Sequence, residues 1–254
     1  MARSRLIVAN WKLNPTTLAE AKRLALAAKA ASAKAKKVQV VLCPPAVYLA
    51  TLLTAPGKLL FGAQDTFTEF EGAFTGEISP LQLRDLGVKY VIVGHSERRK
   101  RGDTLEVIAA KTRAVLKTNL APIICIGEDK RDGDGDYLEG LVRELEFILD
   151  KVPRQAAKRI VLAYEPRWAI GALATGADTP EQFLHHAIFL RKTLVNLFGK
   201  EIGMSLPILY GGSVNVKNAD SFLTVGQADG LLIGRESLQI KNLVEIIKLA
   251  AKAV

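Results

Sequence analysis

Three residues with side chains suited to proton transfer lie in or just after short apolar runs of the sequence. Glu165 ends the run IVLAYE, His95 ends YVIVGH, and Lys12 comes two residues after RLIVAN. A carboxylate can remove a proton, a neutral imidazole can donate a hydrogen bond, and an ammonium group can stabilise negative charge. Together they suit removal of a proton next to a carbonyl group, with donors stabilising the enediolate that develops. Such chemistry needs neither a metal nor a redox cofactor, and we expect none.

His95 is the histidine that we assign to this chemistry. The residues after it, SERR (96–99), open a helix, and the positive end of a helix dipole disfavours a charged imidazole. We therefore expect His95 to act as a neutral donor. His185 and His186 lie in the middle of a helical pattern without a partner at metal-ligand spacing, and we interpret them as structural or exposed.

Lys12 leaves two kinds of chemistry open. An ammonium group stabilises charge, whereas an uncharged amine can form an imine with a carbonyl substrate, as in an aldolase. Imine formation requires a lysine in an apolar site or beside other cations. Because carboxylates share the predicted site, we favour the electrostatic role, and an imine-forming aldolase stays the alternative function.

Two glycine-containing turns indicate a phosphorylated substrate. YGGSV (210–214) and IGRES (233–237) each lead from an apolar run into a helical segment. Glycine lets the backbone approach a ligand closely, and a helix N-terminus presents N–H groups to an anion. One such turn is a weak signal, but two of them, with a lysine at another strand end, predict a phosphate site.

The elements that must position these residues alternate strictly between strand and helix. Eight short apolar runs read as buried strands, at 5–10, 38–43, 59–64, 90–95, 122–127, 160–165, 207–212 and 230–235. Helical patterns or shorter helical segments follow them, which predicts parallel strands with right-handed crossovers. Eight such units in 254 residues predict an α/β fold, a single (β/α)8 barrel domain spanning 1–254. In such barrels the strand C-termini form the functional face, where Glu165, His95 and Lys12 would meet.

Composition and charge exclude several other classes of protein. No apolar run reaches the length of a membrane span and the N-terminus is not a secretory signal, so we expect no membrane partner. Cys43 and Cys125 lie far apart in apolar runs, which favours buried, reduced thiols in a cytoplasmic protein. The net charge of +9 could indicate a nucleic-acid-binding scaffold. No basic stripe with interleaved aromatic residues occurs, so we expect no nucleic-acid partner.

Metal-ligand spacings are missing from the sequence. The segment DGDGDY (132–137) starts like a calcium loop, but Tyr137 stands where the turn glycine belongs and Arg143 where the bidentate glutamate belongs. We interpret this segment as a polar loop.

Six motifs resemble the triosephosphate isomerase family over essentially the whole chain. They are NWKLN (10–14), GAFTGEIS (72–79), YVIVGHSERR (90–99), CIGE (125–128), AYEPRWAIG (163–171) and YGGSV (210–214). The resemblance implies a TIM barrel that interconverts dihydroxyacetone phosphate and D-glyceraldehyde 3-phosphate as a homodimer without a cofactor.

The resemblance also implies a role for each site residue. Glu165 would move the proton between C1 and C2, His95 would polarise the carbonyl, and Lys12 with Asn10 would stabilise negative charge. Glu97 would support the rim through a hydrogen bond or ion pair to Lys12. Backbone N–H groups would hold the phosphate, at Gly171, Ser213, Gly234 and Arg235.

A lid over the phosphate is the next implication. Pro166 and Trp168 would form its first hinge, and 169–176 would close over the substrate. The chain departs from the family here, because Arg167 replaces a small apolar residue and the stretch before TPEQ (179–182) is about two residues longer. Arg235 replaces a common second glycine, so a positive φ there would be strained. We expect its side chain to point away from the phosphate.

The loop EGAFTGEIS (71–79) would form the contact between two subunits. By resemblance, Thr75 would lie beside the neighbour's active-site rim. Phe70, Phe74 and Ile78 favour an interface, because exposed apolar patches need covering. Asp65, where the family often has asparagine, would lie near this contact and could perturb it.

Overall fold

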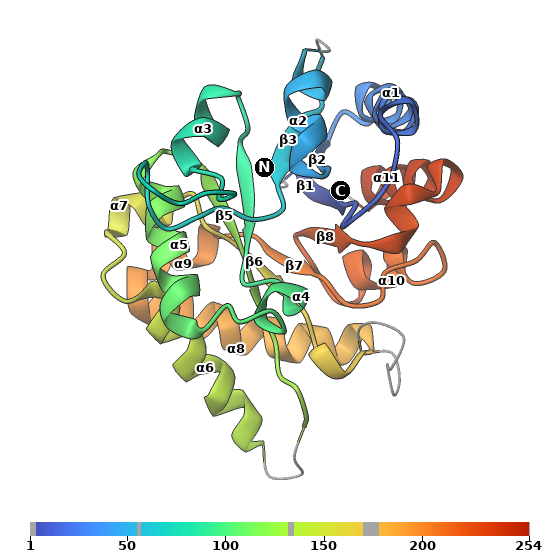
Figure 1. The fold of residues 1–254 in the computed structure, drawn as a ribbon. Coiled ribbons are helices and arrows are strands. Elements are labelled where there is room, and N and C mark those ends of the chain that lie inside the picture. The colour runs from blue at the N-terminus through green and yellow to red at the C-terminus, as the bar shows by residue number, and fades with distance from the viewer. Residues whose placement is uncertain (1–3, 55–56, 132–134, 170–177, 254) are drawn as a thin grey trace.

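Eight parallel strands form a closed barrel with helices around it (Figure 1). The structure is a computed structural model and describes residues 4–54, 57–131, 135–169 and 178–253. Each strand pairs with the next one along the chain, and β8 pairs with β1 to close the ring. The predicted (β/α)8 barrel is therefore confirmed.

All eight predicted strands are present, with ends within about two residues of those expected. They are β1 (Arg5–Asn10), β2 (Val38–Cys43), β3 (Leu60–Ala63), β4 (Tyr90–Val93), β5 (Ala121–Ile126), β6 (Val161–Tyr164), β7 (Ile208–Tyr210) and β8 (Gly230–Ile233). Their side chains alternate between the barrel interior and the helix layer, as strand geometry requires. Leu6, Val8 and Val41 pack inside the barrel, whereas Ile7 and Val40 pack against the helices.

The helices occupy the segments between strands. They are α1 (Leu18–Lys34), α2 (Ala46–Leu53), α3 (Pro80–Asp85), α4 (Ser96–Arg99), α5 (Leu105–Lys117), α6 (Asp136–Leu149), α7 (Arg154–Ala157), α8 (Pro180–Phe198), α9 (Lys200–Ser205), α10 (Ala219–Thr224) and α11 (Ile240–Lys252). Two 3₁₀ segments are η1 (Arg167–Ala169) and η2 (Arg235–Leu238).

Threonine side chains begin the longest helices. The hydroxyl oxygens of Thr17 and Thr179 accept hydrogen bonds from the N–H groups of Glu20 and Gln182. Each hydroxyl pairs one of the N–H groups that a helix start leaves without a carbonyl partner. The predicted polar loop 132–137 is partly wrong, since α6 begins at Asp136; residues 132–134 lie outside the described part.

A buried ion network joins the loop after β3 to α4 and α5. Lys111 Nζ lies 2.8 Å from Asp65 and 2.9 Å from Asp103, and Arg98 Nε lies 2.9 Å from Asp65. Burial raises the pKa of Asp65, although the hydrogen bond and charge of Lys111 oppose the rise. Asp65 thus has partners within its own subunit, and its effect on a subunit contact stays a prediction.

None of the helices in the described ranges is long and apolar enough to cross a membrane. Within the same ranges, no group of three or more His, Cys, Asp or Glu side chains could hold a metal ion.

Replacing Lys111 by methionine should destabilise the protein. The side chain is only 3% exposed, so Lys111→Met removes one of the two cations shared by Asp65 and Asp103 and leaves them only the half-exposed Arg98. We expect a loss of about 3 kcal/mol in the free energy of unfolding at neutral pH. The loss should shrink at acidic pH, where Asp65, whose pKa is raised by burial, takes up a proton. Denaturant unfolding measures it.

Lys248→Met is the matched control. Lys248 pairs with Glu245 at the surface, where the side chains are 62% and 43% exposed, so we expect a change below about 1 kcal/mol. Equal stability losses in the two variants would contradict a structural role for the buried network.

Candidate active site

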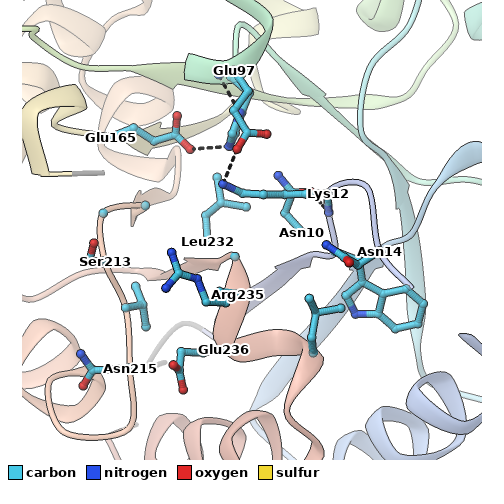
Figure 2. A pocket seen from close by; sticks show the side chains of 17 residues that line it. Asn10, Lys12, Asn14, Glu97, Glu165, Ser213, Asn215, Leu232, Arg235 and Glu236 are labelled. Atoms are coloured by element: carbon cyan, nitrogen blue, oxygen red, sulfur yellow. Dashed lines mark hydrogen bonds and ion pairs between the residues drawn. The ribbon is translucent and has the colours of Figure 1, made fainter. Parts of the chain in front are cut away.

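A cavity of about 520 Å³ opens at the C-terminal ends of the barrel strands (Figure 2). Its lining comes from the ends of β1 and β8 and from the segments after β1, β4, β6, β7 and β8. The lining residues are Asn10, Trp11, Lys12, Asn14, His95, Glu97, Glu165, Gly211, Gly212, Ser213, Val214, Asn215, Leu232, Gly234, Arg235, Glu236 and Leu238. The structure thus brings together every described residue that was predicted for the active site; the dimer-loop Thr75 lies elsewhere.

Glu165 and His95 face each other across this cavity. Glu165 directly follows β6, and its Oε1 lies 3.4 Å from Nε2 of His95. The N–H of Ser96, the first residue of α4, donates to Oε2 of Glu165 at 3.3 Å. Both side chains are nearly buried, at 4% and 8% exposure. The carboxylate is therefore held beside the imidazole and largely shielded from water.

The backbone of α4 selects the tautomer of His95. The N–H of Glu97 donates to Nδ1 of His95 at 3.1 Å, so Nδ1 carries no proton in this geometry. The proton of the neutral ring is then on Nε2, the nitrogen that faces Glu165. A neutral imidazole held in this way would present an N–H donor to the cavity; that His95 is neutral stays a prediction.

Lys12 forms the expected ion pair with Glu97 (Figure 2). Its Nζ donates to Oε1 of Glu97 at 2.7 Å. Partial burial tends to raise the pKa of Glu97, but the hydrogen bond and charge of Lys12 outweigh it, and the pKa is lowered. This contact keeps a positive charge at the cavity, next to the Glu165–His95 pair.

The turn that carries Lys12 is fixed by two side chains. Asn10 Oδ1 accepts the N–H of Lys12 at 3.0 Å, and Gln64 Nε2 donates to the carbonyl of Lys12 at 2.8 Å. The sequence placed Gln64 only at a strand end and gave no sign of this role.

Two glycines leave room for Glu165. A Cβ at Gly127 would lie 1.8 Å from the carbonyl oxygen of Glu165, and a Cβ at Gly211 would lie 2.8 Å from its Cγ. Any larger residue at either position would displace the carboxylate or its backbone. The glycines after β5 and β7 thus fix where the proposed base can lie.

The predicted phosphate-binding residues lie on two neighbouring turns. Ser213 follows β7, and Gly234 and Arg235 follow β8. Arg235 is not among the residues with positive φ, so its backbone does not carry the strain that a positive φ would cause. Its side chain was expected to point away from the phosphate, but it lines the cavity, and Figure 2 shows the guanidinium on the side of Ser213. Gly171 lies outside the described residues.

The predicted lid falls mostly outside the described residues, which omit 170–177. Of its first hinge, Trp168 lies in η1, and its Nε1 donates to Glu128 at 2.8 Å. Arg167, a departure from the family pattern, forms two hydrogen bonds with Asp129, at 2.7 and 3.0 Å.

A polar network below this hinge was not predicted. Glu128 accepts hydrogen bonds from Tyr164, Trp168 and Arg131, and Arg131 also pairs with Asp178 at 3.0 Å. Burial raises the pKa of Asp178, against the opposing charge of Arg131. The network joins both ends of the 170–177 segment to the loop after β5. A short motif such as CIGE gives no signal of such partners, because they come from distant loops.

Comparison with known proteins gives one consistent family. The family model described as Triosephosphate isomerase matches residues 5–250. The triosephosphate isomerase of Rhodopirellula baltica is 39% identical over 259 residues, with 100% of each chain covered. That of Chloroflexus aurantiacus is 40% identical, covering 95% of this chain and 97% of the relative. That of a Roseiflexus species is 39% identical, covering 96% and 97%.

Glu97→Gln should change how stability depends on pH. The lowered pKa of Glu97 in the folded state means that its ionised form stabilises the fold above its ordinary pKa of 4.5. This stability is lost as pH falls through the lower, folded-state pKa. We expect Tm of the variant to be about 1–3 °C below that of the parent at pH 7. The two Tm values should converge at the acid end of a pH series.

Glu139→Gln is the control for this series. Glu139 pairs with Arg143 on α6, where both side chains are more than two-thirds exposed. A Tm difference for Glu97→Gln that stays constant at acidic pH would argue against the ion pair as its cause.

Proposed function

The chain belongs to the triosephosphate isomerase family, and from this premise we propose that Glu165, His95 and Lys12 carry its isomerisation of dihydroxyacetone phosphate and D-glyceraldehyde 3-phosphate. One observation carries this assignment. The Glu165 carboxylate lies 3.4 Å from Nε2 of His95 in a cavity that Lys12 also lines. A base, a neutral donor and a cation therefore surround a space large enough for one small substrate.

The proposed reaction moves one proton between adjacent carbons. Glu165 removes a proton from C1 of dihydroxyacetone phosphate, and the C–H electrons form the C1–C2 double bond of an enediolate. The carbonyl π electrons move to the C2 oxygen, towards which the Nε2–H of His95 donates. The protonated Glu165 then returns the proton to C2, while the C1 oxygen becomes the aldehyde. The hydroxyl protons redistribute between the two oxygens, so atoms and electrons balance without a cofactor or metal.

Lys12 and Asn10 help to stabilise the negative charge that develops on the substrate oxygens. The ammonium group of Lys12 stabilises the enediolate oxygens, because a fixed charge in a partly dry cavity acts more strongly than in water. Asn10 holds the Lys12 turn through the 3.0 Å hydrogen bond to the Lys12 N–H. Glu97 positions the ammonium group through the 2.7 Å ion pair.

Backbone N–H groups hold the phosphate in this proposal. Ser213, Gly234 and Arg235 supply them from the turns after β7 and β8, and Gly171 supplies another from the lid of 169–176. Barrels of this type commonly bind phosphate between these two turns. The lid would exclude water from the enediolate and so prevent loss of phosphate.

The alternative, an imine-forming aldolase, finds no support in the site. Lys12 Nζ donates to Glu97 at 2.7 Å, a contact that favours the ammonium form over the neutral amine that an imine needs. Reduction with borohydride in the presence of substrate separates the two functions, because only an imine leaves a covalent adduct on the protein.

We also propose that the chain forms one domain and acts as a homodimer in the cytoplasm. Large apolar side chains on the segments after the first three strands support the dimer: Leu13 is 86% exposed, Val47 79% and Phe74 44%. Thr75 is exposed on the same loop as Phe74, where it would reach the partner's rim. Both cysteines, Cys43 and Cys125, are unbridged and buried, which suits a reducing compartment.

Glu165→Gln tests the proposed base. Glutamine keeps the size of the side chain but cannot take up the proton, so we expect kcat to fall roughly 10²- to 10⁴-fold with KM little changed. A coupled assay of triose phosphate interconversion measures both constants. Glu245→Gln on the outer surface of α11 should behave as the parent. An inactive parent, or a fully active Glu165→Gln variant, would refute the assignment.

Phe74→Glu tests the proposed dimer. The charge would lie in the apolar interface, so we expect the variant to sediment as a monomer at micromolar concentration and to lose activity. Phe147→Glu on α6 is the matched control, because Phe147 is also 44% exposed. A parent protein that is monomeric and fully active would rule the dimer out.

A further inference from the structure

We infer that the guanidinium group of Arg235 binds the phosphate group of the substrate directly and sets the preference of the site for phosphorylated trioses. This inference rests on the proposed function, because it concerns the same cavity and substrate. It adds a side chain to the backbone N–H groups proposed above. It also replaces the sequence-based expectation that this side chain points away from the phosphate.

The position of Arg235 is the first support. It begins η2 directly after Gly234, and its exposed side chain lines the cavity. Figure 2 shows its guanidinium on the side of Ser213, the turn that is proposed to hold the phosphate. A Cβ at Gly234 would lie 3.3 Å from Cε of Lys12, so the stem of Lys12 packs beside the start of η2. Arg235 therefore lies on one of the two proposed phosphate turns, and its guanidinium is turned towards the other.

The charges that line the cavity are the second support. Two permanent cations and three carboxylates line it: Lys12, Arg235, Glu97, Glu165 and Glu236. Lys12 is already paired with Glu97 at 2.7 Å, and Glu236 accepts a hydrogen bond from Asn242 at 2.6 Å. Among the residues that the structure describes, none forms a hydrogen bond or ion pair with the guanidinium of Arg235. Arg235 is thus the cavity cation whose charge is still available.

A phosphate group needs such a cation. It carries close to two negative charges at pH 7 and would enter a cavity whose carboxylates outnumber its cations. A guanidinium group can donate two parallel hydrogen bonds to phosphate oxygens, which a backbone N–H cannot. Because this contact is remote from the carbon atoms that react, it should strengthen substrate and transition-state binding equally. The expected signature is a lower KM without a change in kcat.

Arg235→Gln and Arg235→Lys test the inference. Glutamine removes the charge, whereas lysine keeps the charge but not the planar fork. We expect Arg235→Gln to raise KM for D-glyceraldehyde 3-phosphate roughly 5- to 20-fold with kcat within about twofold, and lysine to fall between the two. The dependence of kcat/KM on salt should also become shallower in the glutamine variant. Arg143→Gln on α6 is the control for loss of one exposed arginine, and it should match the parent.

Two probes separate a phosphate contact from other effects. Unphosphorylated D-glyceraldehyde should be turned over equally slowly by the parent and Arg235→Gln. Inorganic phosphate should bind the glutamine variant at least about threefold more weakly, by titration calorimetry and as a competitive inhibitor. A smaller change in phosphate binding, or an equal loss of kcat/KM with D-glyceraldehyde, would overturn the inference.

The phosphate titration also separates this inference from the proposed function. If the parent isomerises triose phosphates and phosphate binds parent and variant alike, the role of Arg235 fails and the function stands. If the parent does not isomerise them, the function fails, and the calorimetric comparison still decides whether Arg235 binds phosphate.

Discussion

Two backbone N–H groups in the first turn of α4 determine the geometry of the site. The N–H of Ser96 donates to Glu165, and the N–H of Glu97 donates to Nδ1 of His95. Neither group has a carbonyl partner within the helix, because a helix always leaves its first N–H groups unpaired. A single turn therefore orients the proposed base and selects the tautomer of the proposed donor. The side chains alone, which follow separate strands, could not set either property.

The closed barrel places the first turn of α4 beside Glu165. β4 carries α4, β6 carries Glu165, and β5 lies between them. The N–H of Glu165 donates to the carbonyl of Ile126 at 2.7 Å, and Gly127 lets the carbonyl of Glu165 approach where a Cβ would lie 1.8 Å away. The end of β5 thus fixes the backbone of Glu165, while α4 fixes its carboxylate. Because β5 and α4 both hold Glu165, its side chain has little freedom to move. Acid–base catalysis requires this kind of preorganisation.

The sequence predicted the parts of this arrangement that depend on local patterns. The eight apolar runs predicted the strands, and strand ends predicted that Glu165, His95 and Lys12 would meet. The contacts of Gln64 with the Lys12 turn and the pairing of Asp65 with Lys111 could not be predicted, because each joins residues that lie 46 or more positions apart in the sequence. The sequence also could not show that the side chain of Arg235 lines the cavity, because this depends on how the folded chain places the neighbouring turns.

The turn at Lys12 shows how hydrogen bonds of the fold offset backbone strain and so hold the ammonium group in place. Lys12 has φ of 54°, a left-handed conformation that costs a residue with a side chain about 1 kcal/mol. The hydrogen bonds from the Lys12 N–H to Asn10 and from Gln64 to the Lys12 carbonyl offset this cost. Both partners come from strand ends, so the barrel itself holds the strained turn. The ammonium group is then already beside Glu97 and the Glu165–His95 pair before a substrate enters, and little reorganisation is needed when negative charge develops.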